Sequence, residues 1–227
     1  MKRLVLFVEG EGDERGAPVL VKRILTEQNA WQHVILDLNP FRVRDLGNLT
    51  GRKQDNWTRW LAAANKRPNL GAVLLLLDGD ARPTAGQSFC AARVARELSQ
   101  RARGVGAGSI FSVATVFACR EYESWLIACA ERLAGRPLPD GRLGLQPGTV
   151  APAGDLEVTP RDAKGWLDQH MQSGYKPTRD QQPLTRLMVD HLDAIRRRQM
   201  RSFRRLENAL QQLVNAVRSG SHIATTE

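Results

Sequence analysis

Short apolar runs alternate with stretches of helical spacing over the first 130 or so residues of the chain. Continuous apolar runs rich in Val and Leu predict strands that are buried on both faces, and amphipathic stretches between them predict helices. This alternation is typical of βαβ units, so we expect an α/β fold with a mostly parallel central sheet flanked by helices. The predicted strands are 4–8, 34–38, 72–77 and 110–118, and the predicted helices are 17–28, 56–65, 89–103 and 121–133.

The pattern changes after residue 134, where Gly and Pro become frequent and periodicity is lost. Thr159 and Pro160 suit the N-cap and the first position of a helix, which we expect to reach about residue 171. An irregular stretch then precedes two helical segments that run to the region of Val217. We therefore predict an α/β domain over 1–134, a linker or loop over 135–158, a helical C-terminal region over 159–218 and a frayed tail over 219–227.

The composition is typical of a water-soluble globular protein, with 42% hydrophobic and 25% charged residues. No apolar run approaches the roughly 20 residues that cross a bilayer. The apolar stretch after Met1 breaks at Glu9 and lacks the small-residue cleavage site of a signal peptide. We therefore expect a cytoplasmic protein without a membrane span.

The chain is strongly basic, with a formal net charge of +9. Such an excess favours a polyanionic partner such as nucleic acid, although solubility or the Arg-rich composition of a GC-rich genome would also account for it. Trp57 and Trp60 have the spacing to stack on bases, but core packing is the stronger expectation. The densest basic stretch either contacts phosphates, forms a solvated helix face or docks an acidic partner; it contains Arg196, Arg197, Arg198, Arg201, Arg204 and Arg205.

Cysteine and histidine usage argues against a zinc site. The three cysteines form no Cys-x-x-Cys pair, their number is odd, and the four histidines lack ligand spacing. A disulfide framework is therefore not expected, and a metal, if present, should be held by oxygen ligands.

Acidic residues follow two of the predicted strands. The first strand leads into Glu9-Gly10-Glu11-Gly12-Asp13, and the strand 72–77 leads into Asp78-Gly79-Asp80. The carboxyl ends of parallel strands meet at one edge of a sheet, and Mg²⁺ prefers oxygen ligands. Asp-Gly is also a common turn pair, and acids after a strand often complement the next helix N-terminus. The combination of two such strand ends predicts a shared acidic site.

Other charged residues are expected near this edge. Arg82 and Arg120 could clamp phosphate oxygens or neutralise the acids. Glu121 and Glu123 follow the strand 110–118 and share the edge if that strand is parallel. Their alternative role is that of N-terminal helix acids beside a core residue, Trp125.

The acidic motifs resemble the signature of the Toprim superfamily, which includes primases, topoisomerases, recombination-repair proteins and nucleases. The resemblance covers roughly residues 1–130 and rests on Val8-Glu9-Gly10 with Asp13, and on Leu77-Asp78-Gly79-Asp80. It implies a Rossmann-like fold with a central parallel sheet, binding of Mg²⁺ or Mn²⁺, and phosphodiester chemistry. In that reading Glu9 is a general acid/base or metal ligand, and Asp78 and Asp80 bind the metal, with Asp13 as a further ligand. Arg82, beside the acidic pair, is a candidate catalytic residue because it could clamp phosphate oxygens.

Nearly the whole chain also resembles an uncharacterised bacterial family, domain of unknown function 4276. The matching segments are Val8-Glu9-Gly10, Arg120-Glu121-Tyr122-Glu123-Ser124-Trp125, Tyr175-Lys176-Pro177 and Ser202-Phe203. Glu121 and Glu123 belong to this pattern and are candidate metal ligands. The family is often encoded beside an ATPase, which implies an ATPase partner.

These patterns predict a metal-dependent nuclease that acts on DNA or RNA, as the effector of an ATPase-linked defence or DNA-repair system. The metal would polarise a phosphate and activate a water molecule. The alternative is a non-catalytic Toprim-fold subunit that binds nucleic acid or the ATPase. A topoisomerase would need a tyrosine nucleophile on a further DNA-gripping domain, and a primase would need nucleotide-handling modules, of which the sequence shows no sign.

Overall fold

The computed structural model describes residues 1–50, 56–79 and 89–225, and its centre is a six-stranded, entirely parallel sheet. The strand order is β2-β1-β4-β5-β6, and β3 pairs with the end of β1 beyond β2. The predicted α/β fold with a mostly parallel sheet is therefore confirmed. The strands are β1 (Lys2–Val8), β2 (Val34–Leu36), β3 (Phe41–Arg42), β4 (Leu70–Asp78), β5 (Ser112–Ala118) and β6 (Ala224–Thr225).

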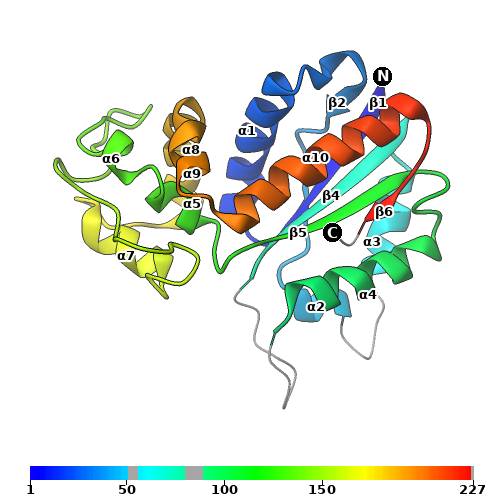
Figure 1. Cartoon of the computed structure of the whole chain (residues 1–227), viewed down its shortest axis with the longest axis horizontal. Coiled ribbons are helices and arrows are strands. Elements are labelled where there is room, and N and C mark those ends of the chain that lie inside the picture. Colours follow the sequence, from blue (N-terminus) through cyan, green and yellow to red (C-terminus); the bar gives the residue numbers. More distant parts are fainter. Residues whose placement is uncertain (51–55, 80–88, 226–227) are drawn as a thin grey trace.

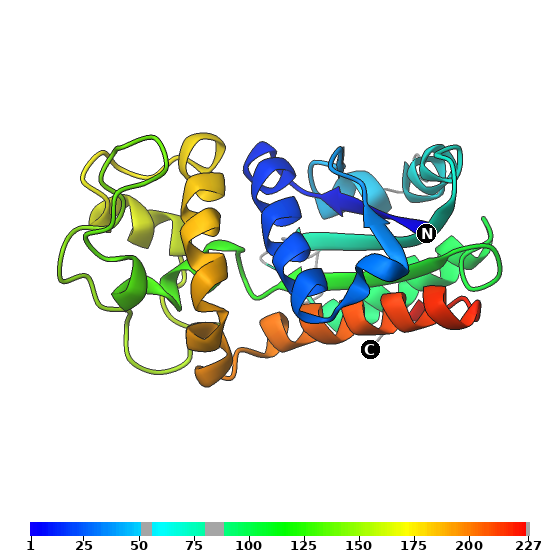
Figure 2. The same cartoon turned by 90° about the horizontal axis from the view of Figure 1, so that it is seen from above.

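Helices cover both faces of the sheet, as the uninterrupted apolar runs of its central strands require. All nine residues of β4 and all seven of β5 are buried. Helices α1 (Glu11–Glu27) and α10 (Arg201–Ser219) lie on one face, and α2 (Leu46–Thr50), α3 (Asn56–Asn65) and α4 (Ala91–Arg103) lie on the other (Figures 1 and 2).

A smaller, mostly helical lobe lies beside the edge of the sheet where β4 and β5 end (Figure 1). Irregular segments and short turns connect its helices, including a single π-helical turn, Pro177–Gln181, directly before α8. Its helices are α5 (Glu123–Ile127), α6 (Ala130–Leu133), α7 (Ala163–His170), α8 (Gln182–Met188) and α9 (Leu192–Arg197).

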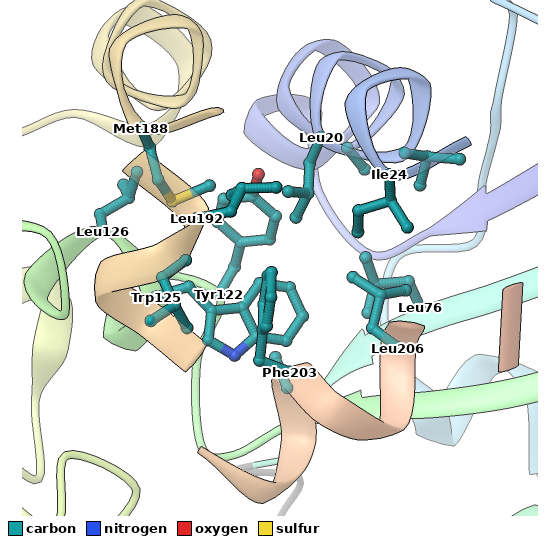
Figure 3. Packing of buried hydrophobic residues seen from close by; sticks show 14 of the residues in the cluster. Leu20, Ile24, Leu76, Tyr122, Trp125, Leu126, Met188, Leu192, Phe203 and Leu206 are labelled. Carbon is teal, nitrogen blue, oxygen red and sulfur yellow. The ribbon is translucent and has the colours of Figure 1, made fainter. Parts of the chain in front are cut away.

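The two parts share one hydrophobic core. Trp125 of α5 packs edge-on against Phe203 of α10, with ring centroids 5.6 Å apart, and its indole N–H donates to Ser202 Oγ at 3.0 Å (Figure 3). Met188 of the small lobe and Leu20 of α1 belong to the same buried cluster. The small lobe is therefore fixed against the sheet by apolar packing, which holds the residues of the intervening edge in place.

Two sequence predictions about the second half of the chain are wrong. The helix expected from Thr159 begins at Ala163, because Asp162 is the N-cap and accepts a hydrogen bond from Gly165 N at 2.7 Å. The tail expected to fray from residue 219 returns to the sheet as β6, since Val113 N donates to Ile223 O at 2.8 Å and β6 pairs with β5.

The helix boundaries differ elsewhere too. The first helix starts at Glu11 rather than near residue 17, and the predicted helix 121–133 is divided into α5 and α6. Within the predicted C-terminal region, α7, α8 and α9 belong to the small lobe, whereas α10 covers the sheet. Along the parts of the chain that are described, none of the helices combines the length and apolarity needed to span a bilayer.

Candidate functional site

Carboxylates from three neighbouring strands meet at the edge of the sheet that faces the small lobe. Glu9 follows β1, Asp78 is the last residue of β4, and Glu121 comes three positions after the end of β5. Strands β1, β4 and β5 are adjacent and parallel, so their carboxyl ends share this edge. The expectation that the strand before Glu121 is parallel is confirmed.

Asp78 is the central residue of this acidic site, and only 9% of it is exposed. Its Oδ1 accepts a hydrogen bond from Tyr122 N at 2.8 Å, and its Oδ2 accepts one from Lys164 Nζ at 2.9 Å. The backbone N–H of Asp78 donates to Glu9 Oε2 at 3.1 Å. Glu9 therefore fixes the main chain at the end of β4, and Asp78 in turn fixes the start of the small lobe.

Lys164, which sequence reasoning missed, lies among the acids. Its Nζ is 2.9 Å from Asp78 Oδ2, 2.9 Å from Glu121 Oε1 and 3.7 Å from Glu123 Oε2. The other oxygen of Glu121 accepts the backbone N–H groups of Ala163 and Lys164 at 2.8 and 3.1 Å, so this carboxylate caps α7 and positions the lysine. Burial alone would lower the pKa of Lys164, but the neighbouring carboxylates raise it above its ordinary value.

Glu123 is the most deeply buried acid of the site, at 1% exposed. Its Oε1 accepts a hydrogen bond from the Tyr175 hydroxyl at 2.8 Å, whereas its buried Oε2 has no hydrogen-bond partner. Burial and the nearby Asp78 carboxylate raise the pKa of Glu123 to about 8. Burial also raises the pKa of Asp78 to about 7, although Lys164 opposes this shift. One ammonium group thus lies within 4 Å of three carboxyl groups, and burial favours the protonated form of Glu123.

Asp13 lies near these residues but is already engaged. Its Oδ2 accepts a hydrogen bond from Gly10 N at 2.9 Å, which caps α1, and its Oδ1 accepts one from Gln181 Nε2 at 2.6 Å. Burial raises the pKa of Asp13. Asp13 therefore joins α1 to the π-helical turn, and its candidacy as a metal ligand stays a prediction.

Some features of this site favour the binding of a divalent metal and others do not. Asp80 and Arg82, predicted as metal ligand and catalytic residue, lie outside the described residues. Within the ranges 1–50, 56–79 and 89–225, no group of three or more His, Cys, Asp or Glu side chains is arranged to hold a metal ion. The donor atoms of Asp78, Glu121 and Glu123 are nevertheless all oxygens, as Mg²⁺ prefers, and one of them is an unpartnered buried oxygen. Lys164 Nζ stands at the position on which they converge.

Three arginines of the predicted basic stretch pair with different acids. Arg196 pairs with Glu27 and with Glu207, the latter at 2.7 Å. Arg197 pairs with Asp193 at 2.6 Å, and Arg198 pairs with Glu131 at 2.8 Å. The remaining three arginines, Arg201, Arg204 and Arg205, belong to the start of α10.

The two tryptophans of α3 differ in their surroundings. Trp57 is fully buried and donates to Leu98 O at 2.9 Å, as core packing predicts. Trp60 is only partly buried and lines a pocket with several arginines.

Comparison with known proteins gives one match. A family model described as Domain of unknown function (DUF4276) matches residues 8–211, a range that includes every acid named above and Lys164. No curated protein and no solved structure matches the chain.

Proposed function

The chain belongs to the DUF4276 family, and we propose that it is a divalent-metal-dependent nuclease that hydrolyses phosphodiester bonds of DNA or RNA at the acidic site. The observation that best supports this proposal is the convergence of Asp78, Glu121 and Glu123 on a single cation position. The proposal includes a relationship to the Toprim superfamily, because Glu9 and Asp78 lie at the carboxyl ends of adjacent parallel strands.

The metal ligands in this proposal are Asp78, Glu121 and Glu123, with Asp80 as a predicted fourth. Mg²⁺ or Mn²⁺ bound there would polarise a phosphate and lower the pKa of a bound water molecule. Lys164 has to leave its present position when a metal binds. Its ammonium group is positively charged and stands on a flexible side chain, so it is suited to neutralise a phosphate oxygen of the substrate.

Other residues hold these ligands in place. Glu9 accepts the backbone N–H of Asp78, and Tyr175 donates to one oxygen of Glu123, leaving the other oxygen available. Glu121 uses one oxygen to cap α7 and presents the other to the cation position. Because these hydrogen bonds already hold the carboxylates in place, less conformational entropy would be lost when they order around a metal.

A nuclease assay tests the proposal. Labelled single-stranded DNA, double-stranded DNA and single-stranded RNA are incubated with wild type or Asp78→Asn in Mg²⁺, Mn²⁺ or EDTA, with and without the predicted ATPase partner. We expect cleavage by wild type with metal, and a loss of roughly 100-fold or more in Asp78→Asn. Asp190→Asn is the control, because Asp190 is exposed and its ion pair within the described part of the chain is a surface contact with Arg23 at 3.5 Å. Cleavage that persists in EDTA, or equal activity in Asp78→Asn, contradicts the proposal.

A second candidate is a non-catalytic subunit in which the ionic cluster serves structure. The observation in its favour is that Lys164 already pairs with Asp78 and Glu121 at hydrogen-bond distance. In this case the cluster ties α7 to the end of β4, and the basic surface binds nucleic acid or an ATPase partner.

Lys164→Met separates the two candidates. Removing one partner from a buried ion pair leaves uncompensated charge, and we expect a loss of about 1–3 kcal/mol in EDTA, reduced from the fully buried case because 37% of the lysine side chain is exposed. If the site binds metal, Mg²⁺ should raise the melting temperature of Lys164→Met more than that of wild type or of the exposed-lysine control Lys176→Met. Destabilisation that Mg²⁺ leaves unchanged favours the structural role.

A further inference from the structure

A basic pocket of about 550 Å³ lies next to the acidic site. We propose that this pocket binds a phosphate group and an adjacent base of a nucleic-acid strand whose neighbouring phosphate reaches the acidic site. The inference rests on the proposed function and adds a substrate-binding site to it. The residues that line the pocket are Arg42, Arg44, Asn48, Asn56, Arg59, Trp60 and Ala63.

The backbone places this pocket directly beside Glu9. Strand β3 pairs with the last residues of β1, with Val8 opposite Arg42. Beyond the strand, Arg44 N donates to Glu9 O at 3.1 Å. Glu9 in turn accepts the backbone N–H of Asp78, so two hydrogen bonds connect the pocket to the acidic site. A strand bound in the pocket would therefore continue along the same edge of the sheet.

Two of the three arginines that line the pocket have no acidic partner among the described residues. Arg44 and Arg59 are exposed, and neither forms an ion pair with any acid in the part of the chain that the structure describes. Arg42 lies 3.7 Å from Glu11 and 3.9 Å from Glu14, which is too far for direct hydrogen bonds. Guanidinium groups match phosphate oxygens in geometry as well as in charge, so a phosphate is the anion that this set suits.

The backbone of Arg44 is unusual for a residue with a large side chain. Its φ is 75°, in the left-handed region that non-glycine residues seldom adopt. Hydrogen bonds from Val43 N to Val8 O and from Arg44 N to Glu9 O hold the chain in this turn. Strained backbone of this kind is concentrated at binding sites, where it directs a particular side chain.

Trp60 supplies a flat apolar wall. Its ring packs edge-on against Phe41 at 5.6 Å, and Phe41 stacks on Phe7 at 4.8 Å, so the aromatic group is anchored in the core behind the pocket. Trp60 also lines the pocket, and its side chain is partly buried. A rigid indole next to arginines is the combination by which proteins bind single-stranded nucleic acid through stacking and phosphate contacts.

Binding without cleavage tests the inference. The fluorescence anisotropy of short, labelled single-stranded DNA and RNA is measured in EDTA at several salt concentrations. We expect Arg44→Ala and Arg59→Ala each to weaken binding several-fold and to reduce the salt slope by about 0.7. Trp60→Ala should weaken binding by roughly five-fold or more without changing the slope, and Trp60→Phe, which keeps a ring, should lose less.

Arg218→Ala is the matched control, because Arg218 is exposed in the last turn of α10 and makes no ion pair with another described residue. Binding by Arg44→Ala and Arg59→Ala that equals the control overturns the inference, even if wild type cleaves nucleic acid. Weakened binding by these variants supports it, even if no cleavage is found and the nuclease proposal fails. Both arginines are exposed, so thermal melts are expected to show folded variants.

Discussion

At the scale of single residues, Glu123 carries a large electrostatic cost, because its carboxyl group is buried beside other acids. It is almost completely buried, one of its oxygens accepts no hydrogen bond, and Lys164 Nζ is 3.7 Å from that oxygen. Burial favours the neutral acid, so the pKa of Glu123 rises from an ordinary value of 4.5 to about 8. In the absence of a bound cation, this side chain is expected to hold a proton at neutral pH.

This shift predicts how stability depends on pH. Between about pH 5 and pH 8 the folded state binds more protons than the unfolded state, so the free energy of unfolding should fall as the pH rises through this window. Glu123→Gln cannot titrate and should flatten the dependence. Part of the pH dependence of stability should remain in this variant, because burial also raises the pKa of Asp78, to about 7. The measurement is the melting temperature in EDTA from pH 5 to pH 8.5, where each kcal/mol corresponds to roughly 2–4 °C.

The control for this prediction is Asp190→Asn, which changes an exposed carboxylate and should reproduce the wild-type curve. Equal pH dependence in wild type and Glu123→Gln would show that Glu123 titrates normally in the folded protein.

At the scale of elements, the first turn of α1 packs against the π-helical turn Pro177–Gln181 through Gly12. A Cβ atom at position 12 would lie 2.0 Å from Gln181 Oε1 and 2.9 Å from Pro177 O. Glycine therefore permits the close approach that lets Gln181 donate to Asp13. This contact holds the small lobe against the helix that follows Glu9.

Gly12→Ala tests this contact. An alanine in a helix is ordinarily more favourable than glycine by about 1 kcal/mol, but here the clash should reverse the sign and destabilise the protein by roughly 1–3 kcal/mol. The control is Gly10→Ala, whose Cβ would meet Asp13 Oδ2 at an ordinary 3.5 Å. Urea denaturation measures both variants. A Gly12→Ala protein as stable as Gly10→Ala would mean that the two elements do not pack this closely.

Local sequence patterns predicted the central elements well. β4 and β5 are buried on both faces and therefore appear as continuous apolar runs, and α3 has the predicted bounds. The start of α7 was missed because only part of what stabilises it is local. Asp162 is the N-cap, but Glu121, 42 residues earlier, also accepts the N–H of Ala163. The two-residue strand β6 is too short to give a periodic signal.

At the scale of the whole molecule, some features of the candidate site follow from local sequence patterns and others depend on contacts between distant parts of the chain. The topology of a parallel sheet was enough to predict that Glu9, Asp78 and Glu121 share an edge. Lys164 was not predictable, because it follows a long irregular segment and reaches Asp78 across 86 positions of sequence. The basic pocket likewise depends on how β3 and α3 pack, which charge and spacing alone do not specify.

The position of α10 has a consequence for the synthesis of this protein. Domains begin to form from the N-terminus as the chain leaves the ribosome. Strands β1, β4 and β5 emerge before residues 201–219, the helix that covers one face of the sheet. The apolar side chains on that face, Leu74, Leu76, Ala114 and Val116 among them, have no α10 to cover them until then. The nascent chain thus passes through a stage with an open apolar sheet, and protection from aggregation matters most during that interval.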